Sequence, residues 1–158
     1  MFGYHGKILL VDLTSETFDW IDIEEEHLRQ FIGGVGLGAY LLFKFSVPGA
    51  DSFDPSSPLI FVTSPLVGTR LTTSSKFAVV SKSPLTGFIN DSLSSSFCAT
   101  ELKKCGCDAL IIIGKAKQPT LLFVQNGNVS FLDAKYLTGL STAETEKTVK
   151  ETLTDYLV

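Results

Sequence analysis

The densest group of hydrogen-bonding side chains lies at residues 90–96, with the sequence Asn-Asp-Ser-Leu-Ser-Ser-Ser. A Pro-Leu-Thr-Gly turn precedes this stretch and a short helical pattern follows it, so we expect a polar loop that leads into a helix. The first turn of a helix has unpaired N–H groups and the positive end of the helix dipole, which with the serine hydroxyls suits a phosphate. The alternative is that Ser95 or Ser96 is only the N-cap of the helix.

The most glycine-rich stretch is residues 33–39, Gly-Gly-Val-Gly-Leu-Gly-Ala. Its spacing is similar to a dinucleotide-binding fingerprint, which requires a preceding strand and an acidic residue roughly 20 positions later. Here Leu28, Phe31 and Ile32 form a helical pattern before it, and no acidic residue stands at the end of a following strand. We therefore interpret the stretch as a break between two helices, where small residues allow close approach of a strand or a ligand.

The cysteines and histidines do not form a pattern typical of a metal or nucleophile site. Cys98 and Cys105 are seven positions apart on one predicted helical face, which favours small buried side chains, and Cys105-Gly-Cys107 lacks the C-x-x-C spacing of zinc or cluster ligands. His5 and His27 are isolated, and the carboxylates gather at predicted helix starts, where we expect them to be solvated. No local pattern identifies a nucleophile, general acid or general base.

These residues are positioned by an alternation of apolar strands and amphipathic helices. The strands expected from apolar runs and turn residues are 7–13, 16–22, 58–63, 76–82, 108–114, 120–125 and 128–133. Helices are expected around Leu28 to Ile32, from Leu37 to Phe45, from Ser96 to Lys104, and from the capping-box sequence at Ser141 through Leu157. Thr14-Ser15 and Asn126-Gly127 are expected to be hairpin turns.

One short sequence occurs twice, as Ser-Pro-Leu-Val-Gly at residues 64–68 and Ser-Pro-Leu-Thr-Gly at residues 83–87. Each copy follows a predicted strand and should form the same turn, because proline fixes φ and glycine permits positive φ. Two such strand ends would face each other around a shared shallow cleft that binds anions. The alternative is that the sequence is simply a favourable turn.

Composition limits the class of protein. The 158 residues fit one domain, and 44% hydrophobic with 19% charged residues is a globular balance. A net charge of −4 gives no electrostatic reason to expect nucleic acid or an anionic membrane as a partner. We find no apolar run near the roughly 20 residues of a membrane span and no signal-peptide pattern. Three cysteines are few and odd in number, which favours the reducing cytoplasm.

Taken in order, these stretches resemble the N-terminal domain of tungsten-containing aldehyde:ferredoxin oxidoreductases over essentially the whole chain. The resemblance rests on an ordered set of short motifs: Tyr-His-Gly-Lys at 4–7, Val-Asp-Leu at 11–13, Gly-Gly-x-Gly-Leu-Gly-Ala-Tyr-Leu-Leu at 33–42, Pro-Leu-Ile-Phe at 58–61, Ser-Pro-Leu-x-Gly-Thr at 64–69, Val-Val-Ser-Lys-Ser-Pro-Leu-Thr-Gly at 79–87, Glu-Leu-Lys at 101–103, Asp-Ala-Leu-Ile-Ile-Ile-Gly-Lys at 108–115, Asp-Ala at 133–134 and Thr-x-Glu-Thr at 142–145.

The resemblance implies an α+β fold of duplicated sheet-plus-helix halves, on which a tungsten (or molybdenum) bis-molybdopterin cofactor rests. In the family, later domains supply the 4Fe-4S cysteines and the acid–base residues, and the whole enzyme oxidises aldehydes to carboxylic acids and reduces ferredoxin. The cofactor supplies the redox chemistry and the protein supplies position and electrostatics. We therefore expect residues 1–158 to be one cofactor-cradling domain, inactive in isolation. Its expected partners are the remaining domains, a separate catalytic subunit or a second copy.

Several positions depart from the family pattern. Where the family has Gly-Gly-Arg-Gly, this chain has Val35, and where an arginine contacts the pterin phosphate it has Lys76, which is cationic but lacks the bidentate fork.

The family's Asn-Ser-Gly-Gly loop, which contacts the pterin and its bridging magnesium, here reads Leu93-Ser94-Ser95 followed by Ser96. The resemblance makes Lys76, Leu93, Ser94 and Ser95 the expected cofactor-binding residues, with the Leu93 backbone carbonyl as a magnesium ligand. Serine adds a Cβ where glycine would permit close approach of a ligand. The alternative function is therefore a non-catalytic scaffold or dimerisation module that has lost the cofactor.

Overall fold

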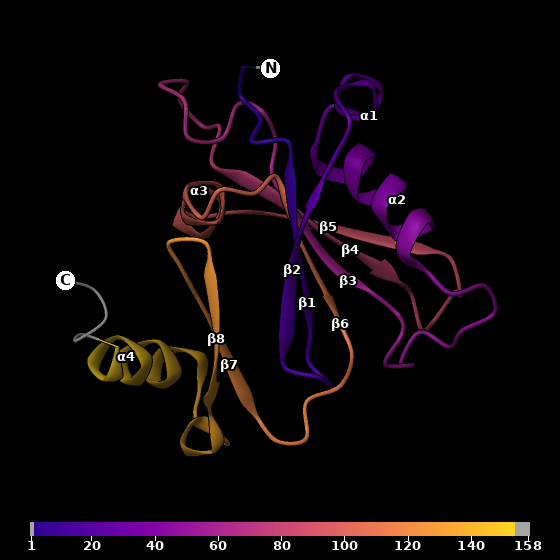
Figure 1. Cartoon of the computed structure of the whole chain (residues 1–158). Helices are drawn as coiled ribbons and strands as arrows, with labels where there is room; N and C mark the ends of the chain where they lie inside the picture. Colours follow the sequence, from indigo (N-terminus) through magenta and orange to yellow (C-terminus); the bar gives the residue numbers. More distant parts are fainter. Residues whose placement is uncertain (1, 154–158) are drawn as a thin grey trace.

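The computed structural model describes residues 2–153, which form a six-stranded mixed sheet, a separate two-stranded hairpin and four α-helices (Figure 1). The strands are β1 (Lys7–Asp12), β2 (Thr17–Asp22), β3 (Leu59–Val62), β4 (Lys76–Lys82), β5 (Ile89–Ser95), β6 (Ala109–Ile113), β7 (Thr120–Gln125) and β8 (Asn128–Asp133). The helices are α1 (Glu25–Phe31), α2 (Gly34–Phe45), α3 (Phe97–Lys104) and α4 (Thr142–Thr152), with a 3₁₀ turn η1 (Lys135–Leu137).

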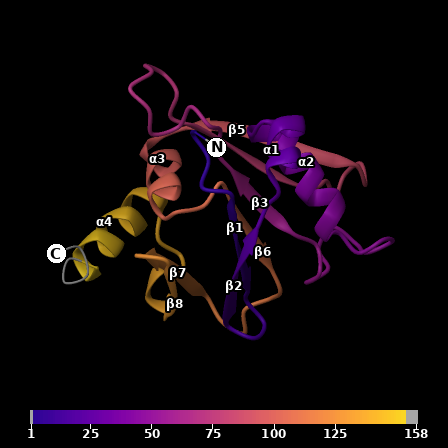
Figure 2. The same ribbon diagram turned by 45° about the horizontal axis from the view of Figure 1, so that its top comes forward.

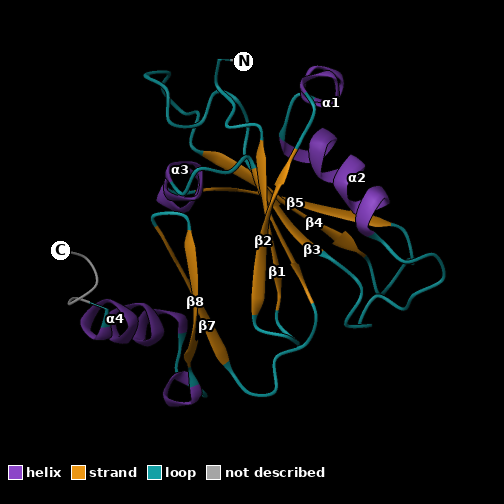
Figure 3. Cartoon of the chain, viewed as in Figure 1, coloured by secondary structure: helices purple, strands orange, loops and turns teal. Residues whose placement is uncertain are grey.

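The six-stranded sheet has the order β2-β1-β6-β3-β4-β5. The pair β1·β6 is parallel and the other neighbours are antiparallel. Helices α1 and α2 lie on one side of this sheet, and the β7–β8 hairpin, α3 and α4 lie toward the other side (Figures 2 and 3). In the strand order given above, β5 forms one edge of the sheet and β2 forms the other.

The strands alternate their side chains between two hydrophobic clusters. On the α2 side, Ile60, Val62 and Val80 pack against Leu37 and Leu41. On the hairpin side, the buried residues are Leu9, Val11, Cys107 and Val129.

Close packing of α2 on the sheet depends on Gly38, since a Cβ at this position would lie 2.5 Å from Val80 Cγ2. On the opposite side of the sheet, Trp20 Nε1 in β2 donates to the Gly127 carbonyl at 3.0 Å, and this hydrogen bond joins the β7–β8 hairpin to β2.

Most of the expected local elements are confirmed. The turns at Thr14-Ser15 and Asn126-Gly127 join antiparallel strands, and Asn126 and Gly127 have φ of 52° and 79°, as a two-residue hairpin loop requires. The capping box at Ser141 and Glu144 is also present. Helix α4 ends at Thr152, and the predicted continuation to Leu157 falls outside the described residues.

The α+β class is confirmed. The order of a hairpin followed by helices occurs twice along the chain, once from β1 to α2 and once from β7 to α4, although the two parts are unequal because only the first contributes to a large sheet.

Within residues 2–153, none of the helices is both long enough and apolar enough to cross a lipid bilayer.

The two Ser-Pro-Leu-x-Gly segments do form turns, and Gly68 and Gly87 have φ of 82° and 73°. The prediction that they face each other is wrong. Strand β3 runs antiparallel to β4, so the turn that follows β3 lies at one end of the sheet and the turn that follows β4 lies at the other. Similar sequence after two consecutive strands brings the turns together only when the strands are parallel.

Candidate functional site

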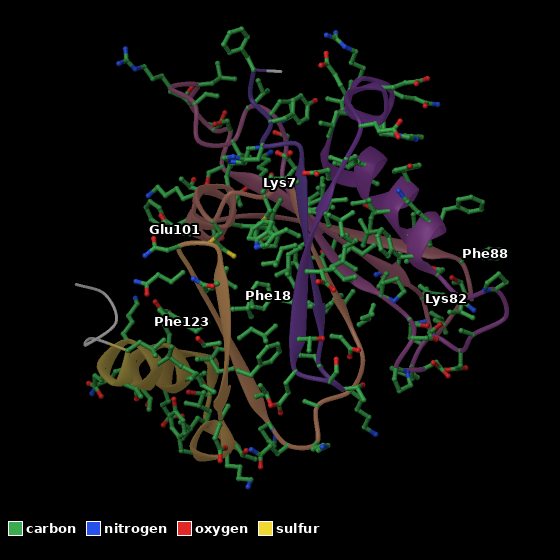
Figure 4. All side chains as sticks on the ribbon, in the orientation of Figure 1. Lys7, Phe18, Lys82, Phe88, Glu101 and Phe123 are labelled. Carbon is green, nitrogen blue, oxygen red and sulfur yellow. The ribbon has the colours of Figure 1, made fainter. Side chains whose placement is uncertain are left out.

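Several of the predicted motifs meet at one end of the sheet, which we call the Lys76 end. Strand β4 begins here at Lys76, β5 ends here at Ser95, and β3 ends here before the turn at residues 64–68. The opposite end, which we call the Lys82 end, carries the turn at residues 83–87; Figure 4 shows Lys82 and Phe88 there, far from Lys7 and Glu101. The candidate site is therefore built from strand ends that only the sheet topology brings together.

The stretch at residues 90–96 is not the predicted loop. Residues Ile89–Ser95 form the edge strand β5, which pairs with β4 along its whole length, from Lys82↔Ile89 to Lys76↔Ser95. Every residue of β5 is exposed, so no alternation of apolar and polar residues marks it in the sequence. Pairing with the more apolar β4 supplies its backbone hydrogen bonds, which makes a polar edge strand stable.

The register of β4 and β5 places the side chains of the four expected cofactor-binding residues on two opposite faces of the sheet. Lys76 is directly opposite Ser95, and Leu93 is opposite Ala78, so these side chains share the face that α2 covers further along. Ser94 is opposite Phe77 and projects from the other face. Three of the four expected residues therefore lie together, and the Ser94 hydroxyl lies apart from them.

A groove of about 470 Å³ opens beside Lys76, and its lining is Thr73, Ser75, Lys76, Ser95, Ser96 and Phe97. Lys76 is exposed, and no ion pair with it occurs within residues 2–153. The other polar side chains of the lining carry hydroxyls, and none of the lining residues in the described part of the chain carries a carboxylate. A cation surrounded by hydroxyl donors attracts an anion such as a phosphate.

The wall of this groove is fixed by hydrogen bonds between the loop before β4 and the start of α3. Ser75 Oγ donates to the Ser96 carbonyl at 2.6 Å and lies 3.0 Å from Thr100 Oγ1. Ser96 Oγ accepts from Cys98 N–H at 3.1 Å, which confirms the N-cap reading for Ser96. In the same loop, Thr73 has φ of 59°, a strained value for a β-branched residue. The groove is thus a defined surface with one strained residue at its rim.

The start of α2 uses its glycines to approach a strand end. A Cβ on Gly33 would lie 2.8 Å from the Thr63 carbonyl oxygen, and Gly34 N–H donates to the same oxygen at 2.9 Å. The close partner of this glycine-rich stretch is therefore the end of β3. The break between α1 and α2 lies at Ile32 and Gly33, whereas residues 34–39 form the first turns of α2. The interpretation as a helix break is therefore confirmed for Gly33 and is wrong for the rest of the stretch.

A buried charge cluster adjoins the Lys76 end, and the prediction that the carboxylates are solvated is wrong for it. Asp108 is 1% exposed, forms an ion pair with Lys103, and accepts from Gly6 N–H at 2.7 Å and His5 N–H at 3.0 Å. The Lys103 ammonium also lies 5.6 Å from the centre of the Tyr4 ring. The sequence signal was an aspartate placed directly before a buried strand, with Cys107 and Ala109 on either side.

The cysteines differ in exposure. Cys107 is buried, Cys105 is partly buried and Cys98 is exposed, so the prediction of a buried side chain is wrong for Cys98. The buried residues of α3 are Ala99 and Lys103, which are four positions apart and share one face of the helix, and Cys98 is not on that face. Within residues 2–153, no three His, Cys, Asp or Glu side chains are close enough to hold a metal ion.

Comparison with known proteins places this arrangement in a family. The family model described as "Aldehyde ferredoxin oxidoreductase, N-terminal domain" matches residues 8–157. A tungsten-containing aldehyde ferredoxin oxidoreductase of Pyrococcus abyssi (strain GE5 / Orsay) is 43% identical over 155 residues, which are 98% of this chain and 26% of that protein. An aliphatic sulfonate oxidoreductase, WOR-like subunit, of Pyrococcus furiosus is 39% identical over 152 residues, 94% of this chain and 24% of that protein.

Among solved structures, the active site complex BamBC of benzoyl coenzyme A reductase, in complex with 1,5 dienoyl-CoA, matches with a TM-score of 0.92 and 31% identity. The match covers 97% of this chain and 23% of that chain. The chain thus spans about a quarter of the length of the curated relatives it matches. The ordered motifs, the α+β architecture and these matches agree, and the chain belongs to the family of aldehyde ferredoxin oxidoreductase N-terminal domains.

Proposed function

We propose that this chain forms one wall of a tungsten–pterin cofactor site in an aldehyde-oxidising enzyme, and that its Lys76 end holds the phosphate of the cofactor. The observation that carries the proposal is the groove beside Lys76, which combines an exposed lysine without an ion pair among residues 2–153 with a lining of serine and threonine hydroxyls. Relatives named as tungsten-containing enzymes support this assignment.

The residues present fit the anionic part of such a cofactor. Lys76 offers a positive charge, and the hydroxyls of Ser95 and Ser96 offer donors to phosphate oxygens, whereas Thr73 Oγ1 donates to the Thr72 carbonyl at 2.6 Å. Within residues 2–153, strand β5 has no neighbouring strand on its outer side, so alternate backbone groups along it point away from the sheet. We assign the Leu93 carbonyl as the candidate ligand of a bridging magnesium ion, since magnesium prefers oxygen ligands.

When bound, the metal–dithiolene group supplies the two-electron chemistry, and the part of this chain is to hold and orient it. In our proposal, the remaining domains of the enzyme, or a separate catalytic subunit, cover the other side of the cofactor. They supply the 4Fe-4S cysteines and pass electrons to ferredoxin in the cytoplasm. The isolated chain is accordingly expected to have no aldehyde oxidase activity.

The experiment measures phosphate binding to the chain by isothermal titration or by NMR chemical shifts. We expect Lys76→Met to abolish saturable binding of inorganic phosphate, and Lys82→Met to leave it unchanged. Lys82 is a matched control because it lies on the same face and the same strand, at the other end, where it donates to the Ala50 carbonyl at 2.5 Å. Equal binding by both variants would remove the phosphate assignment. Tungsten and molybdenum analysis of the complex purified from its natural host tests the metal.

The second candidate is a scaffold or dimerisation module without a cofactor. It is favoured by exposed apolar side chains at the Lys82 end, where Phe43 is 87% exposed, Leu85 is 91% exposed and Phe88 is 76% exposed. Monomeric proteins rarely leave such side chains together in water. Analytical ultracentrifugation of the chain and of Phe88→Ser tests the dimerisation module. This candidate requires a dimer of the chain, and the substitution should weaken that dimer.

A further inference from the structure

Phe97 is the aromatic residue of the groove beside Lys76, and it has no assigned role. Its side chain is 88% exposed, and it is the first residue of α3, separated from the end of β5 at Ser95 by the N-cap Ser96. A phenylalanine that no core residue covers exposes its ring to water, which is unfavourable unless a partner covers it. Because Phe97 and Lys76 line one groove, the same ligand can reach both.

The position of Phe97 is fixed by its neighbours. Ser96 caps the helix through Cys98 N–H, and the Ser96 carbonyl accepts from Ser75 Oγ, which belongs to the loop on the facing wall. The backbone at the helix start is therefore held from both sides before any ligand arrives. An aromatic side chain has only two rotatable bonds, so covering its ring costs little conformational entropy.

The groove has a charged end and an aromatic wall. Its volume of about 470 Å³ falls in the range of small-molecule sites, which runs from roughly 300 to 1,000 Å³. A phosphate alone would fill only the part near Lys76. The lining also includes the Phe97 ring and the Ser95 hydroxyl, a combination that suits a flat ring that carries heteroatoms.

We propose that Phe97 is a binding residue that stacks on the flat heteroaromatic ring of a phosphate ester, while Lys76 binds the phosphate of the same molecule. The ligand class is a pterin phosphate, and this inference rests on the function proposed above because it adds a ring contact to that phosphate site. Every flat heterocycle has a π-face, so stacking adds affinity, and the hydroxyls around it select heteroatoms.

The test compares two ligands, inorganic phosphate and a 6-hydroxymethylpterin phosphate ester, on the full chain by isothermal titration. We expect Phe97→Ala to weaken binding of the pterin ester by about 5- to 150-fold, the range found for one stacked heterocycle, and to change phosphate binding by less than about twofold. Phe97→Tyr keeps the ring and should retain the affinity, whereas Phe97→Leu keeps the apolar surface and should not.

Phe88→Ala is the matched control, because Phe88 is also an exposed phenylalanine next to an end of β5 but lies at the Lys82 end. It should leave both affinities unchanged. Since the Phe97 ring is exposed, its removal should not unfold the chain, and the fluorescence of Trp20, the one tryptophan, verifies this.

The outcomes separate this inference from the proposed function. If Phe97→Ala weakens the ester and phosphate equally, or weakens neither, while Lys76→Met still abolishes phosphate binding, then the stacking role is wrong and the phosphate site stands. If Phe97→Leu binds the ester as well as the wild type, apolar contact and not the ring is responsible, and the stacking role is also wrong. If the wild type binds neither ligand, both proposals fail.

Discussion

The buried ion pair of Lys103 and Asp108 gives the sharpest test of how this fold is held together. The Asp108 carboxylate receives Lys103 from α3 and the N–H groups of His5 and Gly6 from the segment before β1. One side chain therefore joins the N-terminal segment, α3 and the start of β6. Replacing Lys103 by methionine keeps most of the side-chain volume and removes the charge that balances Asp108.

The expected cost follows from burial. The two side chains are 9% and 2% exposed, so water cannot replace the missing ammonium, and two backbone N–H groups alone would have to stabilise the carboxylate. Removing one partner of such a pair typically costs about 3 to 5 kcal/mol of unfolding free energy. The adjacent residue Lys104 pairs with Glu101 at the surface, where the side chains are 67% and 62% exposed. Lys104→Met should therefore cost no more than about 1 kcal/mol.

The assay is urea unfolding followed by the fluorescence of Trp20, which lies at the contact between β2 and the hairpin. We expect Lys103→Met to lose at least about 2 kcal/mol more than Lys104→Met. The double variant Lys103→Met/Asp108→Leu should be more stable than the sum of the single changes implies, because no unpaired charge remains in it. Similar losses for Lys103→Met and Lys104→Met would show that the buried pair is not what holds these segments together.

Three further predictions concern packing and the cysteines. Gly38→Ala should lower the free energy of unfolding by about 1 to 2 kcal/mol in thermal or urea unfolding, because the clash with Val80 Cγ2 exceeds the gain in helix propensity; an unchanged or raised stability would contradict the close contact. Burial raises the pKa of the Cys107 thiol from 9.0 to about 12. The folded state thus keeps the proton that the unfolded state loses, and stability should fall as the pH rises from about 9 toward 12, less steeply in Cys107→Ala; equal slopes for the two proteins would refute this. In the native protein, a thiol reagent such as DTNB should modify Cys98 rapidly and Cys107 only on unfolding, and mass spectrometry of the digested protein identifies the order.

Local elements could be predicted because their causes lie within a few residues. The Asn126-Gly127 turn, the capping box at Ser141 and the N-cap at Ser96 each depend on backbone angles or hydrogen bonds between near neighbours. The resemblance to the family likewise depends on the order of short motifs along the chain. The sequence alone therefore predicted the α+β class, the family and the type of every α-helix and strand except β5.

The composition of the site depended on contacts between distant parts of the chain. Strand β5 has no apolar periodicity of its own, and only its pairing with β4 makes it a strand and places Ser95 opposite Lys76. In the same way, nothing local in the sequence marks Asp108 as buried. Its partner Lys103 is only 5 positions away, but the N–H groups that complete its site come from His5 and Gly6 in the N-terminal segment.

The sequence by itself determined most of the helices and strands, because hydrophobic period and turn residues act over a few positions, but it did not determine β5, which has no such period. Only the tertiary structure decided which strand ends meet. Strand β3 is antiparallel to β4, so one Ser-Pro-Leu-x-Gly turn joins the Lys76 end and its copy lies at the Lys82 end. Strand direction is set by hydrogen bonding between distant segments and by the burial of shared faces, and no local pattern encodes that choice.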